Sequence, residues 1–322
     1  MTYLVDARSF ASRPTGVGQY ALGRLAELRR EDASARFVLA CDVLESEDVR
    51  ALAAEGMEVH VYGSRVFNSM GVIGYFRFLR RVARTVRPDV VWEPNNLLPF
   101  RPPFATRVVV TMHDTFGLGR PSLRYLLWHL YYRVAFRRTL AVATEIWFNS
   151  RETERQVRAV APRAFERLQT SVTYPVVRVP PREAIAPARR ARPFFLYLGN
   201  IEARKGADLL IAAFRRYRAE GGRADLVFAG IEKNVAVPHE EGFEALGYVS
   251  DEEKFSLLVS AVALVVPSRA EGYGMQVAEA AALRCPCLAS DLAVFREIDG
   301  TGRRVFPLGD LNSLVTELHR LF

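Results

Sequence analysis

Short apolar runs alternate with longer amphipathic segments along the first half of the chain. A short apolar run between polar turns predicts a strand, and apolar residues spaced three or four apart predict a helix. The predicted strands are 3–6, 37–41, 58–62, 89–92, 107–112 and 145–148. The predicted helices are 17–28, 72–86, 123–140 and 152–160. Alternating strands and helices predict a parallel, doubly wound sheet.

The second half repeats this alternation after an interruption. Five prolines fall between residues 166 and 193, where the periodic pattern breaks down. Strands are then predicted at 194–198, 226–229, 245–249, 261–266 and 287–289, and helices at 206–218 and 275–283. We therefore predict an α/β protein with a first Rossmann-like domain at 1–170, a linker at 171–192 and a second Rossmann-like domain at 193–322.

Composition narrows the class of protein. The 322 residues suffice for two domains, and no run of 18 apolar residues is present to span a membrane. The first residues lack the features of a signal peptide, and three cysteines make no disulfide framework, so we expect a cytoplasmic protein. The net charge of +8 favours anionic partners, such as nucleotide phosphates or an anionic membrane. No nucleic-acid-binding motif accompanies it, so we expect no nucleic-acid partner.

The segment 267–279 carries the most specific pattern. Glu271 lies in the loop after a predicted strand, and Glu279 lies in the helix that follows. A helix amino end attracts phosphate, and Gly272 and Gly274 let a ligand approach the backbone. Two carboxylates around a phosphate site suit a ligand with phosphates in the middle and hydroxyl groups at both ends. A nucleotide sugar has this layout.

The same segment resembles the E-x7-E motif of retaining GT-B glycosyltransferases of the group 1 type (family 4). Pro267-Ser268, Glu271-Gly272 and Glu279-Ala280 fit that motif, while Tyr273 replaces the usual phenylalanine and Met275-Gln276 replaces Leu-Pro. The resemblance implies a GT-B fold, in which two Rossmann-like domains face a central cleft. It further implies donor contacts from Gly272, Tyr273, Gly274 and Met275, sugar binding by Glu271 and ribose binding by Glu279.

A second site is predicted after the strand 194–198. Arg204 and Lys205 are adjacent cations that could neutralise a diphosphate leaving group. They resemble the phosphate site of the same family, so Arg204, Lys205 and Glu271 are our catalytic candidates in this domain. Many family members carry arginine where this chain has Asn200, which we place in the donor site. Family analogy also puts the nucleotide base near Tyr248.

In the first half, Gly16 and Gly18 form a G-x-G-x-x-A pattern. A dinucleotide fingerprint here would indicate an NAD-dependent oxidoreductase, but that fingerprint needs a tight turn directly after the strand, and residues 7–15 intervene. The pattern instead resembles a Thr-Gly-Ile-Gly-x-Tyr loop of group 1 transferases, which implies that both glycines line the donor site.

Polar residues also end two neighbouring predicted strands. His113 follows 107–112, and the resemblance implies that it approaches the transferred sugar as a catalytic residue. Acceptor hydroxyl groups could be bound by residues near the same strand ends, namely Glu93, Asn95, Asn96 and Asp114.

Two helices, 72–87 and 123–138, are both aromatic and arginine-rich. An ordinary core face with a solvated face explains this pattern, and so does docking on anionic lipid at the inner face of the cell membrane.

Together these features predict a retaining, metal-independent hexosyltransferase without a cofactor. The chain resembles mannosyl- and related transferases of surface polysaccharide and O-antigen assembly. This resemblance implies GDP-mannose as the favoured donor, with a UDP-sugar possible, and a glycan or a lipid-linked oligosaccharide as the acceptor. The alternatives are a GT-B nucleotide-sugar epimerase, an inactive nucleotide-sugar-binding protein and, remotely, the NAD-dependent oxidoreductase. The family's C-terminal crossing helix is expected to be short or missing after residue 311.

Overall fold

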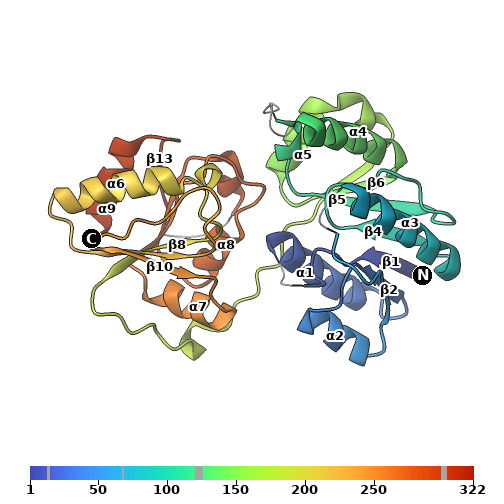
Figure 1. Cartoon of the computed structure of the whole chain (residues 1–322), viewed down its shortest axis with the longest axis horizontal. Coiled ribbons are helices and arrows are strands. Elements are labelled where there is room, and N and C mark those ends of the chain that lie inside the picture. The colour runs from blue at the N-terminus through green and yellow to red at the C-terminus, as the bar shows by residue number, and fades with distance from the viewer. Residues whose placement is uncertain (13–14, 67–68, 120–125, 299–302) are drawn as a thin grey trace. The chain divides into compact units, whose positions relative to one another are not determined.

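The computed structural model describes residues 1–12, 15–66, 69–119, 126–298 and 303–322. The chain divides into two compact units, Met1–Val176 and Val177–Phe322 (Figure 1). The division falls inside the segment 171–192 that the sequence analysis treats as a linker. Each unit has its own sheet and its own hydrophobic core. No helix in the described ranges is long and apolar enough to cross a membrane.

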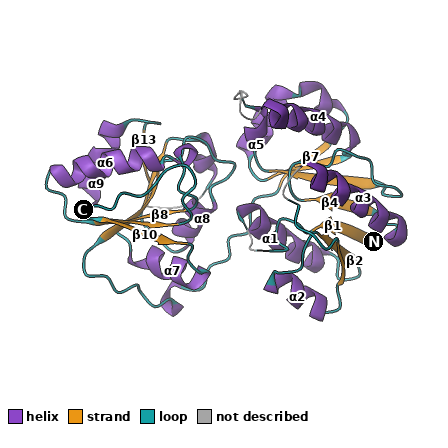
Figure 2. Cartoon of the chain, viewed as in Figure 1, coloured by secondary structure: helices purple, strands orange, loops and turns teal. Residues whose placement is uncertain are grey.

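The N-terminal unit contains a parallel sheet in the order β3-β2-β1-β4-β5-β6-β7. Its strands are β1 (Thr2–Asp6), β2 (Arg36–Cys41), β3 (Glu58–Val61), β4 (Val90–Glu93), β5 (Arg107–Met112), β6 (Glu145–Phe148) and β7 (Gln169–Val172). Its helices are α1 (Gly16–Glu31), α2 (Glu47–Ala54), α3 (Ser69–Val86), α4 (Leu126–Val142) and α5 (Arg151–Val160). Helices α1 and α2 pack on one face of the sheet, and α3, α4 and α5 pack on the other (Figure 2).

The C-terminal unit contains a parallel sheet in the order β10-β9-β8-β11-β12-β13. Its strands are β8 (Phe194–Leu198), β9 (Asp225–Ala229), β10 (Phe243–Gly247), β11 (Ala263–Val266), β12 (Cys287–Ser290) and β13 (Arg303–Phe306). Its helices are α6 (Ala207–Ala219), α7 (Asp251–Ser260), α8 (Met275–Ala282) and α9 (Leu311–Leu321). Helices α6 and α9 bury side chains on one face of the sheet, and α7 and α8 on the other.

Strand order reverses once in each sheet, between β1 and β4 and between β8 and β11. In open α/β sheets, ligands bind at the carboxyl ends of the two strands that flank such a reversal. In the N-terminal unit these ends are Asp6 and Glu93, because Val5 pairs with Trp92. In the C-terminal unit they are the junctions after Leu198 and Val266. The topology therefore marks one ligand-binding edge in each unit.

The sequence analysis did not predict α2, β7, α7, β13 or α9. Strands β7 and β13 lie at sheet edges, and their mostly polar sequences, QTSV and RRVF, lack an apolar run. The start of helix α7 could have been predicted from the sequence, because an S-x-x-E pattern begins there. The Ser250 side chain accepts a hydrogen bond from the backbone N–H of Glu253 and caps the helix. Strand β10 covers 243–247 rather than 245–249, so Tyr248 lies beyond it. Residues 123–125 of the predicted helix 123–140 lie outside the described residues.

Candidate functional site

The two strand-to-helix junctions of the C-terminal unit touch each other at the reversal of its sheet. Gly206 has a left-handed backbone with φ of 72°, and a Cβ atom there would lie 2.0 Å from the carbonyl oxygen of Pro267. The backbone N–H of Arg269 donates to the carbonyl oxygen of Arg204 at 2.8 Å. Only glycine allows this approach, which brings the loop 199–206 against the loop 267–274.

Glu271 is the polar centre of this contact. Its Oε1 atom accepts hydrogen bonds from Ser268 Oγ at 2.8 Å and from Gln276 Nε2 at 3.2 Å. Lys205 Nζ lies 3.5 Å from the same oxygen, and both charged side chains are largely buried. Among the described residues, all these contacts converge on Oε1. The second oxygen, Oε2, remains available to accept hydrogen bonds from a ligand.

The two predicted cations have different surroundings. Lys205 Nζ lies beside Gly199, 3.1 Å from where a Cβ atom on that glycine would stand. Arg204 instead donates to Glu202 Oε1 at 2.6 Å and to the carbonyl oxygen of Ala270 at 3.0 Å. Lys205 therefore contacts Glu271 directly, whereas Arg204 braces the loop that carries Glu271.

Helix α8 begins directly after this loop. Its N-cap residue, Gly274, has φ of 102° and no side chain caps the helix. A Cβ atom on Gly274 would lie 2.5 Å from the ring of Phe295, so the position excludes a side chain. Gly272, Tyr273 and Met275 are half-buried around this turn. The uncapped amino end leaves backbone N–H groups for an anionic ligand beside Glu271.

The second glutamate of the motif has a cationic partner that the sequence analysis missed. Lys254 Nζ in α7 donates to Glu279 Oε1 at 2.7 Å and lies 2.9 Å from Asp251 Oδ1. Burial raises the pKa of Glu279, and the charge of Lys254 opposes that rise. Burial lowers the pKa of Lys254, but its carboxylate partners outweigh burial and raise the pKa above its ordinary value. Within the part of the chain that the structure describes, no side chain bonds to Oε2 of Glu279, so this oxygen could accept hydrogen bonds from a ligand.

Two predicted donor residues are exposed at the same edge. Asn200 follows β8, and its carbonyl oxygen accepts a hydrogen bond from Tyr197 Oη at 2.8 Å. Tyr248 follows β10 and is 59% exposed. The structure thus places Asn200, Tyr248, Glu271 and Glu279 in one unit, on loops and helices that follow β8, β10 and β11 of one parallel sheet.

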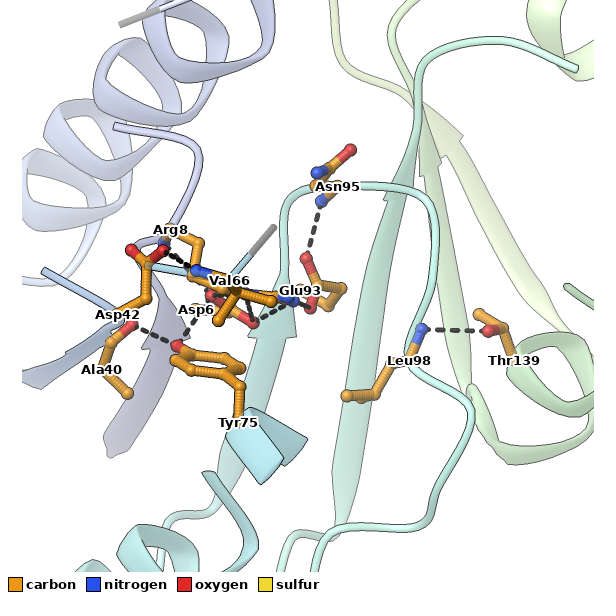
Figure 3. A network of polar contacts seen from close by, with 10 residues as sticks. All are labelled: Asp6, Arg8, Ala40, Asp42, Val66, Tyr75, Glu93, Asn95, Leu98 and Thr139. Carbon is orange, nitrogen blue, oxygen red and sulfur yellow. Dashed lines mark hydrogen bonds and ion pairs between the residues drawn. The ribbon is translucent and has the colours of Figure 1, made fainter. Parts of the chain in front are cut away.

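The N-terminal unit has its own polar cluster at its strand reversal (Figure 3). Arg8 Nη2 donates to Asp6 Oδ2 at 2.7 Å and to Glu93 Oε2 at 3.3 Å. Tyr75 Oη donates to Asp6 Oδ1 at 3.0 Å, and the Arg8 guanidinium lies 4.2 Å from the centre of the Tyr75 ring. Burial and the neighbouring Asp6 carboxylate raise the pKa of Glu93 well above its usual range, although Arg8 opposes this. Glu93 therefore holds a proton more strongly than an ordinary glutamate.

His113 is buried beside this cluster, and both its ring nitrogens have partners. The carbonyl oxygen of Pro94 lies 2.6 Å from Nε2, and Asn149 Nδ2 lies 3.4 Å from Nδ1. A carbonyl can only accept, so Nε2 carries the proton and donates. Burial lowers the pKa of His113 to about 4, against a smaller opposing effect of the Pro94 hydrogen bond. In this structure His113 is a neutral side chain that joins the ends of β4, β5 and β6.

The remaining predicted residues of this unit differ in exposure. Asn96 is half-buried and accepts a hydrogen bond from the backbone N–H of His113 at 2.7 Å. Asn95 is exposed, and its backbone N–H donates to Glu93 Oε1 at 2.9 Å. Asp114 accepts from the backbone N–H of Phe116 at 3.0 Å. Gly16 and Gly18 lie in the first turn of α1, where Gly16 is exposed and Gly18 is buried.

Four functional candidates were missed from the sequence: Asp6, Arg8, Asn149 and Lys254. Asp6 and Asn149 had a detectable signal, because each is a polar residue at the end of an apolar strand. Arg8 and Lys254 had none, because their contacts with Glu93 and Glu279 join residues that are distant in sequence. Within the described ranges, no group of three or more His, Cys, Asp or Glu side chains could hold a metal ion.

Comparisons with known proteins agree with this geometry. Residues 192–322 match the family model described as Glycosyl transferases group 1. The serotype-specific mannosyltransferase WbdA from Escherichia coli is 32% identical over 126 residues, which are 36% of this chain and 16% of that protein. This chain thus matches a small part of the length of that curated relative.

Solved structures share the fold over the whole chain. Sucrose-phosphate synthase from Thermosynechococcus elongatus has a TM-score of 0.72 at 15% identity, covering 100% of this chain and 89% of that one. HepE from Anabaena, in complex with UDP and glucose, has a TM-score of 0.68 at 16% identity, and the match covers 99% of this chain and 89% of that one. The predicted α/β GT-B fold with two Rossmann-like domains is confirmed.

Proposed function

We propose that this protein is a hexosyltransferase that uses a nucleotide sugar, because residues 192–322 match the family model of the group 1 glycosyl transferases. The contact between Lys205 and Glu271, beside the uncapped amino end of α8, carries this proposal. A cation and free backbone N–H groups suit the diphosphate, and the available carboxylate oxygens of Glu271 and Glu279 suit hydroxyl groups of the sugar and ribose.

Lys205, Arg204 and the amides that follow Glu271 are the groups proposed to stabilise the negative charge of the departing diphosphate. Preorganised donors aimed at developing charge are often the largest source of rate enhancement. In our proposal the reaction retains the anomeric configuration by a front-face route, in which the departing diphosphate takes the acceptor proton. No metal ion is required, because the protein supplies the positive charge.

We further propose GDP-mannose as the donor, with a UDP-sugar as the second possibility. Similarity to a mannosyltransferase supports this choice. The proposed acceptor is a glycan or lipid-linked glycan of surface polysaccharide assembly, bound near Glu93, Asn95, Asn96 and Asp114. Its raised pKa favours a protonated Glu93, and a protonated carboxyl group can both donate and accept hydrogen bonds with hydroxyl groups of a sugar.

Arginines and exposed apolar side chains support a further part of the proposal, that the protein works at the cytoplasmic face of an anionic membrane. Helix α3 carries exposed Arg77, Arg80 and Arg84, and α4 carries exposed Arg133 and Arg137 next to exposed Leu130 and Trp128. Such a combination favours an interface between water and anionic lipid.

A thermal-shift screen of nucleotide sugars, with and without a metal chelator, tests the donor. The expected result is one clear stabiliser whose effect survives chelation, because a ligand that binds only the folded state raises the melting temperature. Transfer to an acceptor, followed by NMR of the product's anomeric configuration, tests the reaction. An epimerised sugar would favour the epimerase, and binding without any product would favour the inactive protein. If no nucleotide sugar stabilises the protein and none is consumed, the proposal is wrong.

A further inference from the structure

A groove in the N-terminal unit is lined by residues that belong to neither candidate site. It runs between α4 and the segment formed by the end of α5 and the following turn, Pro162–Glu166, and it encloses about 730 Å³. Phe136, Leu140, Val160 and Pro162 line it with apolar surface. Val160 is 54% exposed there, although a valine ordinarily packs inside. The groove therefore offers an apolar floor that nothing in the described structure covers.

Four arginines surround this floor, and no carboxylate lines it. Arg133 and Arg137 come from α4, and Arg163 and Arg167 come from the opposite side. Over the described ranges, none of the four forms an ion pair, whereas Arg107 and Arg158 of the same unit do. Arg133 donates to the carbonyl oxygens of Leu118 and Gly119, and Arg167 to that of Leu140. Four like charges around one cavity repel each other, and an anion within it relieves that repulsion.

Exposed apolar residues continue from the groove along α4. Leu130, which is 59% exposed, lies one turn before Arg133 and Val134. Val134 is 45% exposed. Leu127, a further turn away, is 83% exposed. Residues three and four apart share a helix face, so the apolar strip meets the arginines at the rim of the groove. An occupant must therefore be anionic at one part and apolar at another.

We propose that this groove binds one anionic phospholipid of a bilayer, with the headgroup phosphate between the arginines and the upper part of an acyl chain on the apolar floor. The inference rests on the membrane surface included in the proposed function, but not on glycosyl transfer. It adds a defined lipid site to what would otherwise be general attraction between a basic protein and an anionic surface.

A water-soluble lipid separates the groove from general attraction. Calorimetric titration would use dihexanoyl phosphatidylglycerol below its micelle concentration, with dihexanoyl phosphatidylcholine and inorganic phosphate as comparisons. We expect saturable binding of the phosphatidylglycerol. The other two should bind at least about tenfold more weakly, because phosphatidylcholine has no net charge and inorganic phosphate has no acyl chain. Equal binding of inorganic phosphate would assign the site to a free anion and overturn the proposal.

Paired variants then locate the site. Arg137→Glu with Arg163→Glu should weaken phosphatidylglycerol binding about tenfold or more. Arg30→Glu with Arg101→Glu makes the same change in net charge at exposed positions of the same unit outside the groove and should leave binding unchanged. Val160→Asp should abolish binding, and Val61→Asp, at an exposed position of β3 that does not line the groove, should not. Circular dichroism checks folding of each variant, and nucleotide-sugar binding checks the C-terminal unit independently. Equal losses in the groove and control variants, or no lipid binding by the wild type, would refute the proposal.

Discussion

Lys254 Nζ lies 2.7 Å from Oε1 of Glu279, so the second glutamate of the E-x7-E pattern is held by a cation from α7. The charge of Lys254 opposes the rise in the pKa of Glu279 that burial causes, and its hydrogen bond occupies Oε1. Lys254→Met should therefore raise the KM for the donor about tenfold with a smaller change in kcat, because in our proposal Glu279 binds the ribose and does not stabilise the transition state.

The same variant should gain a pH dependence. Without Lys254, the effect of burial on the pKa of Glu279 is less opposed and the pKa rises further, so donor affinity should fall as the pH is lowered from neutral into the acid range and recover as it rises. Steady-state kinetics across this range measure the effect. Lys254→Arg should restore much of the affinity, and Asp251→Asn, which removes only the exposed partner of Lys254, should change little. A flat pH profile in Lys254→Met would show that the pair is only structural.

Lys205→Ala and Glu271→Ala should each lower kcat about 100-fold or more while the protein remains folded. Lys205 supplies charge to the leaving group in our proposal, and Glu271 positions the sugar. Arg215→Ala, an exposed position on α6 paired with Glu240, is the matched control. Transfer assays and thermal melts measure both effects. Nearly normal turnover in both site variants would remove these residues from the site.

Gly206→Ala should destabilise the C-terminal unit by about 3 kcal/mol or more, because the new methyl group would overlap the backbone of Pro267 and the left-handed φ disfavours alanine. Gly221→Ala measures the cost of a positive φ for alanine without a steric overlap. Its φ is also positive, at 95°, but nothing lies within 4 Å of the new methyl group, so the cost should be about 1 kcal/mol. Denaturant titration measures the loss in free energy of unfolding for both variants. Equal losses would mean that the loops 199–206 and 267–274 can move apart without cost.

In the N-terminal cluster, Arg8→Met should cost about 3–5 kcal/mol, because it leaves the buried Asp6 without its cation. Glu93→Gln should cost less than about 1 kcal/mol, because the raised pKa of Glu93 makes a neutral amide a close substitute. Chemical denaturation of both variants gives the comparison. A larger loss for Glu93→Gln than for Arg8→Met would mean that Glu93 is ionised in the folded protein.

His113 should make stability depend on pH in the acid range. Its folded pKa of about 4 lies below the ordinary 6.5, so folding favours the neutral ring. The resulting stabilisation is complete above pH 6.5 and is lost as the pH falls towards 4. Between pH 7 and pH 5, the stability difference between the wild type and His113→Gln should shrink by about 2 kcal/mol. Urea titrations at several pH values test this, and a constant difference would contradict the burial of a neutral ring.

The amino-acid sequence alone predicted the parallel α/β architecture, because strands buried on both faces must be continuously apolar and amphipathic helices must repeat every three to four residues. It also predicted Glu271, Glu279 and Lys205 as site residues, since these lie in short local motifs after strand ends. Local signals failed for the edge strands β7 and β13, whose stability comes from pairing with a neighbour rather than from their own apolar runs.

Tertiary structure alone decided which side chains became partners. Lys254 reaches Glu279 from a different helix, and Arg8 reaches Glu93 across 85 positions of sequence. It also decided that His113 is neutral, because burial and the Pro94 carbonyl determine its protonation and neither is visible in a linear pattern. Residue types and spacing thus specify where polar groups leave the sheet, whereas pairing, charge and exposure depend on which strands and helices the fold makes neighbours.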